Sequence, residues 1–87
     1  MHLIANTETI DRLVKQGVDF LRAFHVEFEK DPIGKEAQFL RGEFSGWRTT
    51  LRTEYHDGAG EIVDRVLTET RLPIPAGEIG TDVARAG

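Results

Sequence analysis

The chain has 87 residues and a formal charge of −4, from 11 Lys and Arg residues against 15 Asp and Glu residues. This length fits one domain with a small core, to which a partner subunit would add, and the acidic balance argues against general binding of polyanions. The absence of cysteine excludes disulfides, thiolate metal sites and a cysteine nucleophile, and it predicts a cytoplasmic protein.

The N-terminal residues, MHLIANTETIDR, contain one short apolar patch. No basic region precedes this patch, and it is too short for a signal peptide or for a bilayer span. We therefore expect a soluble chain that makes no membrane contact.

A first helix is predicted over residues 7–29. Asn6, Thr7 or Thr9 can cap its start, and acidic residues follow in the first turns, where the helix dipole favours negative charge. Its apolar residues recur in steps of four and three, which is the spacing of one helix face; they are Ile10, Val14, Gly17, Leu21, Phe24 and Phe28.

A second helix is predicted over residues 32–55. Asp31 would be its N-cap and Pro32 its first residue, a position where the missing N–H of proline costs nothing. Its apolar residues show the same steps of four and three; they are Ile33, Ala37, Leu40, Phe44, Trp47 and Leu51.

The two apolar faces match along an antiparallel helical hairpin. If the chain reverses at residues 30–31, each apolar residue of one face meets one of the other. In this register Val14 lies opposite Trp47, and Gly17 lies opposite Phe44. Small residues then face large ones, as interdigitated packing requires.

The segment 47–55 also fits a β-strand, which would give an α+β fold. Its apolar and threonine residues alternate with mostly charged ones, and Asp57 with Gly58 would form a hairpin turn. We prefer the helix, because the matched register needs Trp47 and Leu51 in it and because the candidate return strand alternates poorly.

A third, shorter helix is predicted over residues 59–70, after the glycine-rich break HDGAG. Its apolar face contains Ile62, Val63, Val66 and Leu67. Residues 72–87 are rich in proline and glycine and have little hydrophobic mass, so we expect a flexible tail or an extended docking arm there. The prediction is a single all-α domain over residues 1–71, followed by this tail.

Gly42 and Gly46 lie one turn apart inside the second predicted helix, where each costs about 1 kcal/mol relative to alanine. Both lie beside the apolar face, together with Phe39 and Thr50. We interpret these four residues as a second seam at which another helix approaches closely, either the third helix of this chain or a helix of a second copy. Alternatively, Ser45 and Gly46 end or kink the helix.

Arg41, Arg48 and Arg52 form a basic stripe along the second helix. This stripe could steer an acidic protein partner or contact phosphates, and a solvated face paired with neighbouring acids explains it as well. A helix-turn-helix made from the second and third helices is the nucleic-acid alternative. Its recognition helix would carry more acidic than basic residues, so we do not favour it.

No catalytic motif is present. The sequence has no phosphate-binding loop, no G-x-S-x-G, no dinucleotide fingerprint and no H-E-x-x-H, and its one serine, Ser45, has no base nearby in sequence. His25, Glu29 and Glu36 fall together in the predicted hairpin and form the best metal candidate, but a His–Glu hydrogen bond at the hairpin tip is the simpler interpretation. We expect no enzyme, no cofactor and no bound metal.

These patterns predict a small, non-enzymatic interaction module such as a regulator, adaptor or accessory subunit. It would bind a protein partner, or a second copy in a homodimer, through the glycine seam, with the arginine stripe steering an acidic partner. A nucleic-acid-binding regulator that uses the arginine stripe is the alternative, and a small enzyme or metal carrier is the second alternative.

Overall fold

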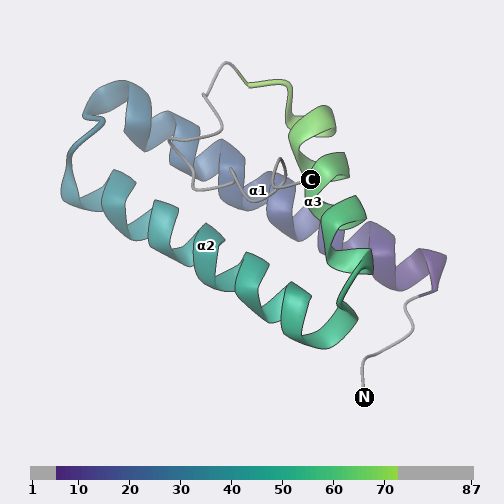
Figure 1. Cartoon of the computed structure of the whole chain (residues 1–87). Helices are drawn as coiled ribbons and strands as arrows, with labels where there is room; N and C mark the ends of the chain where they lie inside the picture. The colour runs from purple at the N-terminus through teal and green to yellow at the C-terminus, as the bar shows by residue number, and fades with distance from the viewer. Residues whose placement is uncertain (1–5, 73–87) are drawn as a thin grey trace.

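The computed structural model describes residues 6–72, which form three α-helices and contain no β-strand. The helices are α1 (Thr7–Lys30), α2 (Lys35–Tyr55) and α3 (Gly58–Thr70). In Figure 1, α1 and α2 lie side by side and antiparallel, and α3 crosses the N-terminal half of α1. The predicted all-α fold is confirmed, and the alternative strand at residues 47–55 is wrong. The predicted tail lies, apart from residue 72, outside the described residues.

The start of α1 is fixed by a side-chain cap. Asn6 has extended backbone geometry, and its Oδ1 accepts a hydrogen bond of 2.8 Å from the backbone N–H of Thr9. Of the three predicted candidates, Asn6 is therefore the N-cap. Glu8 lies in the first turn, where its charge complements the positive end of the helix dipole.

The turn between α1 and α2 is longer than predicted. Asp31 is the C-cap of α1 and not, as predicted, the N-cap of α2. Its Oδ1 accepts a hydrogen bond from the N–H of Ile33, and its carbonyl oxygen accepts one of 3.0 Å from the N–H of Gly34. This local pattern is typical of an aspartate-led turn. As a result α2 begins at Lys35 with Gly34 as its N-cap, and Ile33 is 83% exposed instead of joining the apolar face.

The longer turn also shifts the register of the hairpin. The side-chain atoms nearest to Gly17 belong to Trp47 and Val66, whereas the prediction placed Phe44 opposite Gly17 and Val14 opposite Trp47. The shift from Val14 to Gly17 is three residues, and the start of α2 is likewise three residues later than predicted. The predicted antiparallel hairpin is therefore right, but its detailed pairing is wrong by about one helical turn.

The core lies where all three helices meet. Its largest fully buried side chains include Phe24 from α1, Phe44 and Leu51 from α2, and Val66 from α3. Gly17 of α1 lies where the three helices meet, and both Val66 of α3 and Trp47 of α2 approach the position that a Cβ atom would take. Because glycine has no side chain, three helices can approach one another at this point. The buried hydrophobic residues are Val14, Val18, Leu21, Phe24, Ala37, Phe44, Leu51, Ala59, Ile62, Val63 and Val66.

Polar contacts hold α3 against α1. Arg65 forms ion pairs with Asp11 of α1 at 3.2 Å and with Glu69 of its own helix at 2.8 Å. The hydrogen bonds to Glu69 and Asp11 raise the pKa of the Arg65 guanidinium above its usual value.

The link from α2 to α3 is short, and His56 within it has a positive φ of 53°. This compact link lets α3 fold back onto α1 and α2 directly after α2 ends.

Candidate functional site

The predicted seam lies on the surface of α2 that faces away from the core. We call this surface, defined by Phe39, Gly42, Gly46 and Thr50, the outer face of α2. Phe39 is 61% exposed, and a Cβ atom added to Gly42 or to Gly46 would have nothing within 4 Å. Both glycines lie inside the continuous helix α2, so the alternative that Ser45 and Gly46 end the helix is wrong.

In this chain α3 does not cover the outer face. The apolar residues of α3, among them Ile62, Val63 and Val66, are buried in the core shared with α1 and α2. The prediction that the third helix packs on the glycine seam is therefore wrong within one chain, because the apolar face of α3 is already buried in the core. Whether a second copy or another protein covers the outer face stays a prediction.

Threonine hydroxyls along the outer face are already bonded. The hydroxyl of Thr50 donates to the carbonyl oxygen of Gly46 at 3.1 Å, and the hydroxyl of Thr53 donates to that of Thr49 at 3.1 Å. Such bonds to the preceding turn are typical of threonine inside helices. This part of the outer face therefore needs no polar partner, and a helix without matching polar groups can lie against it.

One edge of the outer face is acidic. Glu36, Glu43 and Glu54 are exposed, and each lies three or four residues from a residue of the outer face, which makes it a direct neighbour on the helix surface. None of the three forms an ion pair with another residue of the described segment 6–72. The outer face is thus an uncharged strip with negative charge beside it.

The arginine stripe lies on a different side of α2 from the outer face. Arg48 and Arg52 line a cavity between α2 and α3, whereas Arg41 donates a hydrogen bond of 3.2 Å to Gln38 and lies 5.7 Å from the ring centroid of Phe24. The predicted seam and the predicted arginine stripe therefore lie on separate surfaces of α2, and of the three arginines only Arg48 and Arg52 line the cavity.

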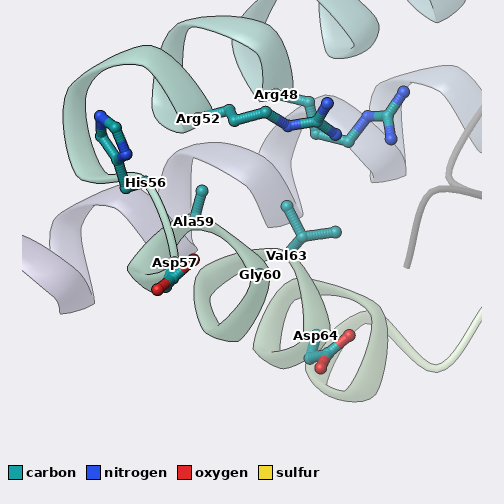
Figure 2. A pocket seen from close by; sticks show the side chains of 8 residues that line it. All are labelled: Arg48, Arg52, His56, Asp57, Ala59, Gly60, Val63 and Asp64. Carbon is teal, nitrogen blue, oxygen red and sulfur yellow. The ribbon is translucent and has the colours of Figure 1, made fainter. Parts of the chain in front are cut away.

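We call the cavity beside Arg48 and Arg52 the arginine pocket. Its volume is about 380 Å³, within the range typical of small-ligand sites. Figure 2 shows the two arginines extending along α2, with Ala59 and Val63 of α3 pointing toward them. The complete lining is Arg48, Arg52, His56, Asp57, Ala59, Gly60, Val63 and Asp64.

Sequence reasoning missed the pocket, although part of its signal was visible. Arg48, Arg52 and His56 are spaced by four residues, so they follow one another along a single helix face. The opposite wall, with Ala59 and Val63, could not be inferred, because it depends on how α3 folds back.

The predicted metal candidate does not form a cluster. Between residues 6 and 72, no group of three or more His, Asp or Glu side chains is arranged to hold a metal ion, so His25, Glu29 and Glu36 are not brought together as ligands. The Nδ1 atom of His25 is buried and has no hydrogen-bond partner there, so it does not make the predicted bond to a glutamate either.

Comparison with known proteins found no match: no protein-family model, no curated protein and no solved structure matches the chain. Within the described residues, each helix is too short or too polar to cross a membrane. The function must therefore be inferred from the outer face of α2 and from the arginine pocket.

Proposed function

We propose that this protein is a non-enzymatic interaction module that binds a helix of a partner protein along the outer face of α2. The observation that carries the proposal is the exposure of Phe39, which is 61% open to solvent beside two glycines with free space above them. An aromatic side chain next to a flat backbone surface offers a partner both an anchor and a place to approach closely.

Burial of Phe39 by a partner contributes a binding free energy of moderate size. Full burial of a phenylalanine side chain is worth about 1.5–3 kcal/mol relative to full exposure, so covering the exposed part of Phe39 gains about 1–2 kcal/mol. Above Gly42 and Gly46, where no side chain stands in the way, a partner side chain can reach the backbone of α2 and bury further apolar area.

The acidic edge indicates what kind of helix binds. Glu36, Glu43 and Glu54 favour a partner helix that carries Lys or Arg beside its apolar residues. Two copies of α2 packed antiparallel about a two-fold axis would instead bring the same edge of each helix together, and Glu43 would face its own counterpart. The charges therefore favour a basic partner helix over an antiparallel homodimer.

Site-specific photo-crosslinking tests the proposal. Phe39→benzoylphenylalanine places the crosslinker on the outer face, and Ile33→benzoylphenylalanine is the matched control, because Ile33 is 83% exposed but lies in the turn. In cells of the native host we expect a specific product at position 39 that maps to a basic helix and is absent at position 33. The charge reversal Glu43→Lys should weaken this product.

Two other outcomes are informative. A product at position 39 that consists of two copies of this chain would replace the basic partner with a homodimer, and light scattering would then show twice the monomer mass. Identical products at positions 39 and 33 would overturn the proposal, because capture would then follow exposure alone.

A further inference from the structure

We infer that the arginine pocket is a binding site for a carboxylate carried on an apolar group. This inference does not depend on the outer face of α2, which lies on another side of that helix. It rests on the wall formed by Arg48 and Arg52, on the apolar wall opposite and on the balance of charge around the cavity.

The basic wall matches a carboxylate in shape and charge. Arg48 and Arg52 lie one helical turn apart and line the same cavity, and Figure 2 shows their guanidinium groups near each other. A guanidinium is a planar fork of N–H donors that pairs with the two oxygens of a carboxylate. Arg52 forms no ion pair with any residue between 6 and 72, unlike Arg65, which already holds Asp11 and Glu69.

The opposite wall is apolar. Ala59 and Val63 are 6% and 5% exposed, and in Figure 2 their side chains point toward the arginines. Gly60 lies between them in sequence and has free space where a Cβ atom would stand. A ligand that places a carboxylate on the arginines can therefore rest a small hydrocarbon group on Ala59 and Val63, where it loses contact with water.

The lining of the pocket favours a carboxylate on a hydrocarbon group over inorganic phosphate. Asp57 and Asp64 also line the cavity; in Figure 2 Asp57 lies at the start of α3, and the carboxylate of Asp64 points away from the arginines. Two arginines and two aspartates balance in formal charge, so the lining holds no excess of positive charge for a polyanion, and inorganic phosphate has no hydrocarbon part to rest on Ala59 and Val63. A single carboxylate held close to the guanidinium groups gains most of the attraction, since interaction energy falls with distance.

Two sources share this chemistry: a free carboxylic acid and a carboxylate within a protein segment. The probes that separate them are hexanoate and the capped peptide acetyl-Leu-Glu-Leu-amide. Hexanamide and acetyl-Leu-Gln-Leu-amide are the matched uncharged controls, and inorganic phosphate tests the rival anion. Tighter binding of the peptide assigns the site to a protein segment, whereas tighter binding of hexanoate assigns it to a free acid.

The experiment is a titration of the full, ¹⁵N-labelled chain at low salt, followed by NMR. We expect hexanoate or the glutamate peptide to shift the Nε–H signals of Arg48 and Arg52 and the amide signals of Ala59 and Val63. Arg52→Gln should weaken this binding about tenfold, as loss of roughly one charged hydrogen bond implies. Arg12→Gln removes the same charge from an exposed position that does not line the arginine pocket, and it should leave binding unchanged.

Three results would overturn the inference. One is equal shifts with the charged probes and their uncharged controls; another is equal weakening by Arg52→Gln and Arg12→Gln; the third is tighter binding of phosphate than of either carboxylate. Arg52 is exposed on the surface of α2, so the variant should fold, and its far-ultraviolet spectrum checks this. Because the crosslinker at Phe39 probes a different side of α2, either proposal can fail while the other stands.

Discussion

Alanine at position 17 and alanine at position 46 are the same substitution in a helix, yet only Gly46→Ala should raise stability. At Gly46 the added methyl group has nothing within 4 Å, so the gain in helix propensity is unopposed. That gain is about 1 kcal/mol. Gly46→Ala should therefore raise the free energy of unfolding by about 1 kcal/mol.

At Gly17 the same methyl group collides with two helices. It would lie 2.5 Å from Cη2 of Trp47 and 2.6 Å from Cγ2 of Val66. Neither neighbour can move cheaply, since Val66 is fully buried and the indole of Trp47 donates a hydrogen bond of 2.7 Å to Gln16. Overpacking of this kind costs about 1–3 kcal/mol, which outweighs or cancels the gain of about 1 kcal/mol in propensity.

Urea unfolding followed by circular dichroism measures both variants. The free energies of unfolding of Gly46→Ala and Gly17→Ala should differ by about 1–3 kcal/mol, with Gly46→Ala the more stable and the slope m unchanged. Equal stabilisation by both substitutions would refute the reasoning, because Gly17 could then not lie between Trp47 and Val66.

Three more predictions concern contacts in the described helices. Phe44→Ala removes a fully buried ring and should cost about 3–5 kcal/mol in urea unfolding, whereas Phe39→Ala at the exposed position should stay within about 1 kcal/mol; similar losses would contradict the assigned faces of α2. Gln16→Leu should cost about 1 kcal/mol, because it removes the acceptor of the Trp47 indole N–H, and it should change the tryptophan fluorescence; an unchanged emission spectrum and midpoint would argue against this bond. Arg65→Gln should lower the thermal midpoint at low salt and less at about 1 M salt, since salt screens exposed ion pairs. Because the pKa of Arg65 is raised on folding, the stability that its charge contributes is complete below the arginine pKa of the unfolded chain and is lost only as the pH rises through the folded pKa. The loss of thermal midpoint in Arg65→Gln should therefore be the same between about pH 6 and pH 9. A loss that varies over this range would point to another titrating group.

The helices themselves could be predicted, because helix formation depends on local spacing. The steps of four and three in residues 10–28 and 33–51 define one apolar face on each helix, and most members of those faces are buried. Ile33, the one member of the two faces that is exposed, shows the limit of the method. Asp31 followed by proline fits both the first residues of a helix and an aspartate-led turn, and only the bond from Ile33 N–H to the Asp31 side chain decides between them.

The candidate sites were harder to predict, because they depend on contacts between helices. The second helix begins three residues later than predicted, and Trp47 lies beside Gly17, where Val66 of α3 also packs. With α3 placed there, the glycine seam stays open, and the wall of α3 that carries Val63 instead meets Arg48 and Arg52. The spacing of residues within α2 cannot predict that the glycine seam stays open or that Val63 of α3 lies opposite Arg48 and Arg52.

The central claim is that Trp47 lies at the junction of the three helices while Phe39 stands open on the outer face of the same helix. A nuclear Overhauser spectrum of the aromatic protons tests it directly. We expect cross-peaks from the indole ring of Trp47 to the Hα protons of Gly17 and the methyl groups of Val66, and none from the ring of Phe39 to residues outside α2. Cross-peaks from Phe39 to α1 or α3, or an indole ring without contacts to Gly17 and Val66, would contradict the account.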